Sequence, residues 1–332
     1  MKSAIGFALL LTLARSDPAL GQSVQVEADV TGGYSTERVS AAATQVRLFG
    51  EAGSWLRVYS EASWAARSDD TASDVFGAAY PYGNRLQAIE AYAEGLFRPR
   101  GALIGFRAGR FRTPFGIHGR SDYAYSGFLR APLIRYDGYF ALSNNHLEHG
   151  AELIVGIPHL YAATTVGAPA DVGSAQRRSG VDSVSRVQGY YGPWIVGASR
   201  IVTTPYMPER FARGRSVFTG VDLRWTHAGV QVVGEWITGR PFDGTHTDGW
   251  HADVIVHRPW MGPVTAVWRS EALDYEAPLP RARRAERHTA GARVRLLRNL
   301  STQINVLHQT GDLSDSFSTA LDFAVTYSVR AR

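Results

Sequence analysis

The chain has 332 residues, with 35 Lys and Arg against 30 Asp and Glu, and 45% of its residues are hydrophobic. It is too polar for a bundle of membrane helices and too rich in apolar residues for a disordered chain. It contains no cysteine, which excludes disulfide frameworks, thiolate zinc sites and cysteine nucleophiles. The length permits two soluble domains or one large β-barrel, and the 34 glycines and many aromatic residues favour turns and aromatic-rich strands.

Residues 1–21 have the features of a secretory signal peptide. Lys2 supplies a positive charge at the N-terminus, and residues 4–14 form an apolar stretch that is too short to span a bilayer. Ala-Leu-Gly at 19–21 offers the small residues of a cleavage site. We therefore expect residues 1–21 to be removed on export and residues 22–332 to form the mature domain. No later stretch is apolar for long enough to form a helical membrane span.

After the signal peptide, hydrophobicity alternates with a period of two residues. In 217–225, for example, Val, Thr, Leu and Trp alternate with Phe, Gly, Asp and Arg. Such a segment forms a strand with one apolar and one polar face. Each of these segments has about the length of a tilted membrane-spanning strand. The predicted strands are 24–34, 44–52, 54–66, 86–97, 102–112, 148–157, 160–167, 181–191, 194–203, 216–227, 230–238, 249–258, 263–272, 287–297, 300–309 and 317–329.

The connections between these strands alternate strictly between short and long. The short ones are rich in Gly, Pro and Asn, which tight turns require. This alternation is typical of a barrel threaded through the outer membrane, whereas a soluble periplasmic β-protein has no reason to show it. We therefore predict an all-β fold, a transmembrane antiparallel β-barrel of about 16 strands with long extracellular loops and short periplasmic turns. The long connections are 35–43, 67–85, 113–147, 168–180, 204–215, 239–248, 273–286 and 310–316.

Two short segments resemble a known family. Residues 109–116 read Gly-Arg-Phe-Arg-Thr-Pro-Phe-Gly, and residues 129–134 read Leu-Arg-Ala-Pro-Leu-Ile. The first resembles the Gly-basic-Phe-basic-x-Pro-Phe-Gly motif of the phosphate-selective (O and P type) porin family of outer-membrane porins, and the second is similar to the segment that follows it there. The resemblance implies a trimeric porin of sixteen strands, with its third loop folded into the lumen and basic residues that select anions.

The longest connection, 113–147, is the third long one and contains many aromatic and apolar side chains. Folding inward against the barrel wall would bury them, which a passive surface loop would not do. We expect this inward-folded loop to narrow a water-filled channel for small hydrophilic solutes, with a preference for anions set by the charges that line it. The basic residues expected along this anion path are Arg107, Arg110, Arg112, Arg120, Arg130 and Arg135.

The parity of the strand before this loop leaves one question open. The polar faces of the predicted strands make the inner wall mixed in charge and slightly acidic. In a regular strand, the side chain of Arg107 would point to one face of the sheet, and those of Arg110 and Arg112 would point to the other. Both sets can face the lumen only if a bulge intervenes, for which Gly109 is the candidate. Otherwise Arg110 and Arg112 lie at the extracellular rim.

The alternative function is a closed outer-membrane barrel that acts as a hydrolase or a structural anchor. Ser143 and His146 are the residue types of an outer-membrane phospholipase, but nothing in the loop indicates a nucleophile-base arrangement. His146 and His149 have a ligand-like spacing, but the zinc motif with paired histidines depends on a helix that the local alternation does not support. We therefore expect no catalytic residue, no cofactor and no metal site.

The expected partners follow from the predicted location in the outer membrane of a bacterial cell. They are outer-membrane lipid and lipopolysaccharide, small hydrophilic solutes or anions, and further copies of the chain in a homotrimer. Nucleic acid is not expected for an exported chain. One arginine cluster at the seventh long connection either contacts lipopolysaccharide phosphates or a neighbouring subunit, or is simply solvated: Arg281, Arg283, Arg284 and Arg287.

Overall fold

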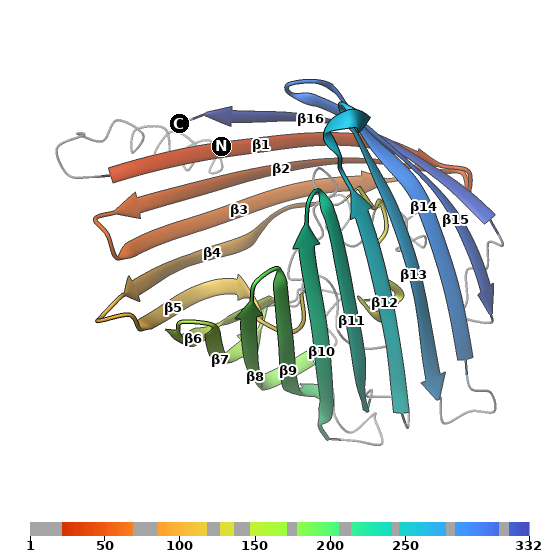
Figure 1. The fold of residues 1–332 in the computed structure, drawn as a ribbon. Helices are drawn as coiled ribbons and strands as arrows, with labels where there is room; N and C mark the ends of the chain where they lie inside the picture. The colour runs from red at the N-terminus through yellow and green to blue at the C-terminus, as the bar shows by residue number, and fades with distance from the viewer. Residues whose placement is uncertain are drawn as a thin grey trace.

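The computed structural model describes residues 22–68, 85–117, 127–135, 147–170, 178–205, 214–240, 246–276, 283–311 and 319–331. In these ranges, sixteen strands each pair antiparallel with the next, and β16 pairs with β1 to close the barrel (Figure 1). This confirms the predicted fold. The strands are β1 (Gln22–Ser35), β2 (Val39–Ala52), β3 (Leu56–Arg67), β4 (Arg85–Phe97), β5 (Leu103–Arg112), β6 (Leu147–Ile157), β7 (Leu160–Pro169), β8 (Arg178–Tyr191), β9 (Trp194–Pro205), β10 (Ser216–His227), β11 (Val230–Arg240), β12 (His246–Val256), β13 (Val264–Glu276), β14 (Arg283–Leu297), β15 (Leu300–Gly311) and β16 (Thr319–Ala331).

Two short 3-10 helices complete the described structure. η2 (Leu133–Arg135) lies in the connection between β5 and β6, and η5 (Pro259–Met261) lies in the turn between β12 and β13. Across the described ranges, none of the helices has the length and apolar character needed to cross a membrane.

The two faces of the wall differ in chemistry. Asp222 and Glu152 are buried on the inner face, whereas their neighbours Val221 and Leu153 are exposed on the outer face. This arrangement is the reverse of a soluble protein, because apolar side chains cover the outside and charged ones lie inside. It follows directly from the period-two pattern, since successive side chains of a strand point to opposite sides.

The connections do not alternate as strictly as predicted. The first one is a three-residue turn at 36–38 rather than a long loop at 35–43, and it is closed by a hydrogen bond from the Arg38 N–H to the Ser35 carbonyl at 2.9 Å. The alanine-rich start of β2 pairs with β1 and β3, and its small inward side chains pack against Leu129, a residue of the third connection. The connection at 241–245 is also shorter than the opposite turn at 257–263.

Candidate functional site: the barrel lumen and the third connection

The end of β5 departs from regular strand geometry just before the third connection. Gly109 has φ +134°, and a Cβ there would lie 2.4 Å from the Ala91 carbonyl oxygen. On the other side of β4, the register with β3 shifts between Glu61 and Ala62, which leaves Ile89 as an extra residue. The irregularity therefore involves β4 as well as the predicted Gly109, and it changes which side chains point inward.

Arg112 and Arg110 lie in different surroundings as a result. Arg112 is buried in the interior, where its guanidinium contacts Glu61 at 2.9 Å and Glu90 at 2.5 Å. Arg110 is half-buried and donates a hydrogen bond from Nε to the Ile89 carbonyl at 3.1 Å. The charge of Arg112 is thus compensated by two carboxylates.

Arg107 is half-buried, unlike Arg112 and Arg130, which are buried. Its side chain is 21% exposed and lies 2.6 Å from Glu94 and 3.2 Å from Glu152. The guanidinium also lies 4.6 Å from the centre of the Tyr92 ring, a cation–π distance. Arg107 is therefore paired, but it keeps part of its surface open to the lumen.

The first arm of the third connection, residues 113–117, crosses to strands far along the chain. The Gly116 N–H donates to Ser199 Oγ on β9 at 3.0 Å, and the Ile117 N–H donates to Glu235 Oε1 on β11 at 3.3 Å. Both acceptors are buried side chains of the inner wall. The arm therefore runs inside the barrel.

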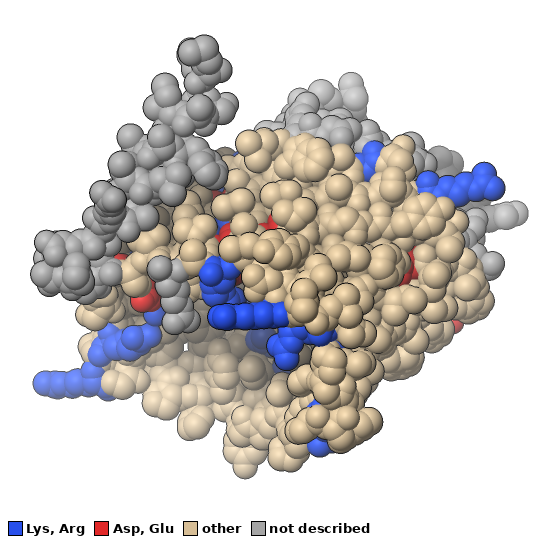
Figure 2. Space-filling view, turned by 90° about the horizontal axis from the view of Figure 1, so that it is seen from above, with Lys and Arg blue, Asp and Glu red and all other residues tan. Residues whose placement is uncertain are grey.

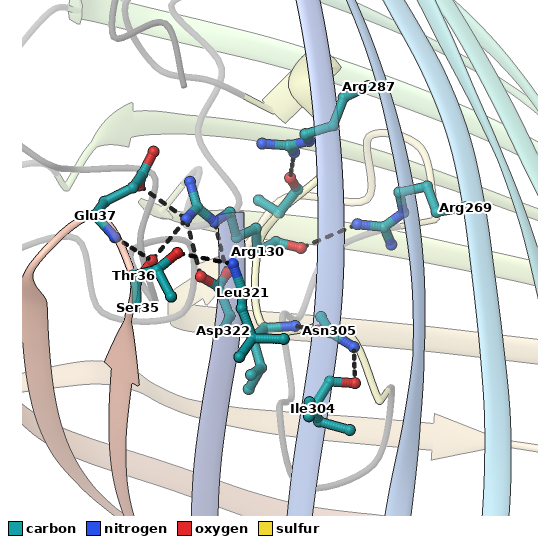
Figure 3. Close-up of polar contacts among 12 residues, drawn as sticks. Ser35, Thr36, Glu37, Arg130, Arg269, Arg287, Ile304, Asn305, Leu321 and Asp322 are labelled. Carbon is teal, nitrogen blue, oxygen red and sulfur yellow. Dashed lines mark hydrogen bonds and ion pairs between the residues drawn. The ribbon is translucent and has the colours of Figure 1, made fainter. Parts of the chain in front are cut away.

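The second arm, residues 127–135, is held by side chains of β13, β15 and β16 (Figure 3). The Leu129 N–H donates to Asn305 Oδ1 at 2.8 Å, and Asn305 Nδ2 donates to the Gly127 carbonyl at 3.0 Å. Further along, the Leu133 N–H donates to Glu271 Oε2 at 2.5 Å. Wall side chains thus satisfy the backbone of this arm, which buried polar groups require.

Arg130, in the second arm, makes several contacts with the wall. It contacts Asp322 at 2.7 Å and Glu37 at 2.8 Å, as Figure 3 shows. Its carbonyl accepts a hydrogen bond from Arg269 at 2.9 Å, and Arg287 donates in the same way to the Ala131 carbonyl at 2.5 Å. Arg130 therefore ties the loop to the wall rather than presenting an uncompensated charge.

Apolar packing reinforces the second arm. Ile134 is fully buried, and Gly249 on β12 makes room for it, since a Cβ there would lie 2.7 Å from Ile134 Cγ2. The wall supplies an apolar patch at inward positions that are polar elsewhere on these strands. The cluster consists of Phe115, Leu133, Ile134, Val184, Ile201, Phe218, Ile237, Leu273 and Ala285.

The remaining predicted residues are only partly placed. Arg120 lies outside the described residues, as do Ser143 and His146 of the alternative hydrolase site. Arg135 belongs to η2, but nothing is described of its side chain. In the described ranges, no three His, Asp or Glu side chains are grouped so that they could hold a metal ion.

Several residues that bind the connection were not predicted for that role. Arg287 was assigned to an extracellular arginine cluster, but it is fully buried in the lumen, because β14 begins at Arg283 rather than at 287. Glu271, which accepts from the Leu133 N–H, was also missed, although it shares the inward parity of Arg269 on β13. Parity alone was the available signal, and it does not reveal which wall residues meet the loop.

A cavity of about 520 Å³ lies at the end of the barrel that carries the short turns. It is lined by four arginines and two carboxylates, which lie on β14, β16, β1 and the turn between β14 and β15. Figure 2, which looks onto the side where the β10–β11 and β12–β13 turns lie, shows arginine side chains gathered beside a hollow. The charged residues of the cavity are Glu27, Asp29, Arg293, Arg295, Arg298 and Arg330.

A closed barrel of sixteen antiparallel strands, with a polar interior and a connection bound inside it, has the architecture of the porins. The sequence matches no protein-family model and no curated protein. Solved porins share the fold.

Three solved structures that are similar to this chain each cover 93% of it. An anion-selective porin from Comamonas acidovorans has a TM-score of 0.65 and 12% identity over 100% of its length. Salmonella typhi OmpF, in complex with daunomycin, has a TM-score of 0.64 and 12% identity over 97%. The trimer form of OmpT, an outer membrane protein of Vibrio cholerae, has a TM-score of 0.58 and 10% identity over 99%.

Proposed function

We propose that this chain is an outer-membrane porin through which small hydrophilic solutes diffuse. The observation that carries the proposal is the closed barrel of sixteen strands, which is charged inside and apolar outside. A barrel of this size leaves an aqueous channel, whereas eight strands would be filled by side chains. The apolar outer face suits hydrocarbon, and the charged inner face suits water and hydrated solutes.

Residues 113–147 form the bottleneck of this channel. Both described arms of the connection are bound to inner-wall side chains, and the two arms contact different parts of the wall. Selection there depends on the width of the opening and on the charges beside it. The chain carries out no chemical reaction in this proposal, since diffusion needs only a wet path.

The proposed anion path uses Arg107, Arg110, Arg112, Arg120, Arg130 and Arg135, but these residues contribute unequally. Carboxylates outnumber arginines among the buried charged side chains of the described residues, and they compensate Arg112 and Arg130. Arg107 is also paired, with Glu94 and Glu152, but it is partly exposed, so it is better supported than Arg112 and Arg130.

The cavity at the short-turn end is the stronger support for an anion preference. Its four arginines exceed its two carboxylates, and Arg47 also contacts both carboxylates, Asp29 at 2.8 Å and Glu27 at 3.7 Å. A basic opening raises the local concentration of anions and lowers that of cations. Phosphate is the anion that the sequence motif suggests.

Export, membrane location and assembly belong to the same proposal. Residues 1–21 direct the chain to the periplasm and are removed, and residues 22–332 insert into the outer membrane beside lipid and lipopolysaccharide.

The chain forms a homotrimer, as the trimer form of Vibrio cholerae OmpT, which shares the fold, suggests. Chemical crosslinking of the purified protein in mild detergent should produce a trimer band. A band of monomer alone would contradict the assembly while leaving the channel intact.

Planar lipid bilayers test the channel directly. The purified, folded protein should insert in discrete steps of conductance, and the reversal potential in a salt gradient should shift toward the equilibrium potential of the anion. Heat-denatured protein is the control for leakage caused by detergent. A shift toward the cation would contradict the anion preference, and the absence of steps would favour a closed barrel.

A further inference from the structure

His251 on β12 is a buried histidine at the centre of the inner wall. Its side chain is fully buried and lies between two carboxylates. Nε2 is 3.5 Å from Glu235 Oε2 on β11, and Nδ1 is 3.2 Å from Asp253 Oδ1 on its own strand. A histidine in this position is surrounded by acceptors on both sides of its ring, which is the environment of an imidazolium rather than of a neutral ring.

The strand ladder explains why charged groups meet at this point. His251 pairs in register with Glu235 on β11 and with Glu271 on β13, so the three side chains lie in one inward-facing row. The row continues to Asp222 on β10 and to Arg287 on β14. Three of the surrounding carboxylates each contact an arginine: Asp222 with Arg186 at 2.7 Å, Asp253 with Arg269 at 2.6 Å and Glu271 with Arg287 at 2.6 Å.

The same group of residues holds both arms of the third connection. On one side of His251, Glu235 accepts the hydrogen bond from the Ile117 N–H of the first arm. On the other side, Arg269 pairs with Asp253 and donates to the Arg130 carbonyl of the second arm. The guanidinium of Arg269 also lies 4.0 Å from the centre of the Phe128 ring. His251 therefore occupies the middle of a chain of contacts that joins the two arms.

We propose that His251 is a positioning residue whose protonation sets how firmly the third connection is held. The inference rests on the proposed channel, since the connection is its bottleneck. The charged groups that face the imidazole are Glu235 from β11, Asp253 from β12, and Arg269 and Glu271 from β13.

The protonation state of His251 decides how many N–H donors its ring offers to the neighbouring carboxylates. An imidazolium donates from both nitrogens, so it can satisfy Glu235 and Asp253 together. A neutral ring keeps one N–H, and when that proton faces Asp253 a lone pair faces the Glu235 carboxylate. The lone pair then repels the Glu235 carboxylate, which weakens its hydrogen bond with the Ile117 N–H of the first arm. Raising the pH should therefore loosen the first arm, and lowering the pH should restore it.

A spin label on the first arm tests the movement without relying on conduction. Because the chain contains no cysteine, Ile117→Cys provides a single attachment site, and the hydrogen bond to Glu235 comes from the backbone of Ile117, which the substitution keeps. The label is attached at one pH, and the electron paramagnetic resonance spectrum of the detergent-solubilised protein is then recorded from about pH 5 to about pH 9. The label should become more mobile at high pH, and reversibly so.

Two variants connect the movement to His251. His251→Asn removes the titrating group, and Glu235→Gln keeps an acceptor for the Ile117 N–H but removes the carboxylate that a neutral ring repels. Both should abolish the pH step in label mobility. His257→Asn is the matched control, because His257 is an exposed histidine just beyond the end of β12, and it should leave the step unchanged. Heat-modifiable migration in gel electrophoresis establishes that each variant is folded.

Conductance is the second measurement. Single channels of the unmodified protein should change conductance over the pH range in which label mobility changes, and folded Glu235→Gln should lack that change. A pH step in label mobility that persists in either folded variant, or a label whose mobility does not depend on pH, would overturn the proposal. If the protein conducts no ions but the label still shows a pH step that depends on His251, the proposed channel function is wrong and the positioning role of His251 is supported.

Discussion

Arg112 shows what a buried arginine does in this barrel. Its guanidinium lies between Glu61 and Glu90, and the side chains of all three residues are almost completely excluded from solvent. Breaking such a group by removing one partner is costly, because the remaining charges stay buried without compensation. Arg57 provides a contrast, since it contacts Glu51 at 3.1 Å while both side chains remain more than a third exposed.

Replacing Arg112 with methionine should therefore destabilise the folded protein by about 3–5 kcal/mol. The matched variant Arg57→Met should cost less than about 1 kcal/mol, because a solvent-exposed ion pair contributes little. Equilibrium unfolding by denaturant in lipid vesicles measures both values. Equal effects of the two substitutions would show that Arg112 is not a stabilising element of the inner wall.

At the scale of a structural element, the end of β5 depends on one glycine. Gly109 adopts φ +134°, a conformation that L side chains rarely adopt, and its α-carbon lies against the backbone of β4. The irregular backbone here accompanies the turn of the chain from the wall into the interior. The third connection can start inside the barrel because the backbone of β5 is irregular at Gly109, near the end of the strand.

Gly109→Ala should weaken the fold by roughly 1–3 kcal/mol and disturb the start of the third connection, since the new Cβ meets the Ala91 carbonyl and the φ angle is strained. Gly32→Ala is the control, because a Cβ at Gly32 meets nothing within 4 Å. Denaturant unfolding gives the stability of each variant, and channel recordings report changes in the opening. An alanine at position 109 that is tolerated as well as one at 32 would contradict this role.

The second arm can be tested at the same scale through Asn305. This side chain accepts from the Leu129 N–H and donates to the Gly127 carbonyl, so it satisfies two backbone groups of the arm at once. Asn305→Ala should leave both buried groups without their partner and cost about 1–3 kcal/mol for each. More frequent flickering between conductance levels should accompany the loss. Unchanged channel noise would mean that the apolar cluster holds the arm by itself.

At the scale of the whole molecule, the charged groups fall into two regions with different roles. The buried charges of the inner wall compensate one another and hold the third connection. The cavity at the short-turn end has more arginines than carboxylates, and Arg295 and Arg298 are exposed there. We expect the first region to fix the width of the opening and the second to influence which ions enter it.

Replacing Arg295 with glutamine should therefore shift the reversal potential away from the anion and leave the stability nearly unchanged. Arg200→Gln is the matched control. Arg200 is exposed at an outward position of β9, so this substitution removes the same charge from the outer face of the barrel. The shift should also weaken as the salt concentration rises, because salt screens exposed charges. Identical shifts for the two variants would show that net charge alone, rather than the cavity, determines the selectivity.

The barrel itself was predictable because the information for it is local. Alternation of apolar and polar residues needs only neighbouring positions, and it predicted sixteen strands with a charged inner face. The first connection was misread because the alanine-rich segment before position 44 lacks a strong alternation. It is strand through its pairing with β1 and β3, and its inward side chains pack against Leu129, which is far away in the chain.

By itself, then, the sequence determined a closed ring of strands, with apolar residues outside, and marked the third connection as unusual. Only the tertiary structure decided what binds this connection, because Glu235, Asn305 and Asp322 reach it across more than a hundred residues of chain. It also showed that Arg112 and Arg130 are compensated and that Arg287 lies inside rather than at the rim. The sign and number of charges can be read along a chain, but their pairing depends on distances that closure of the barrel creates.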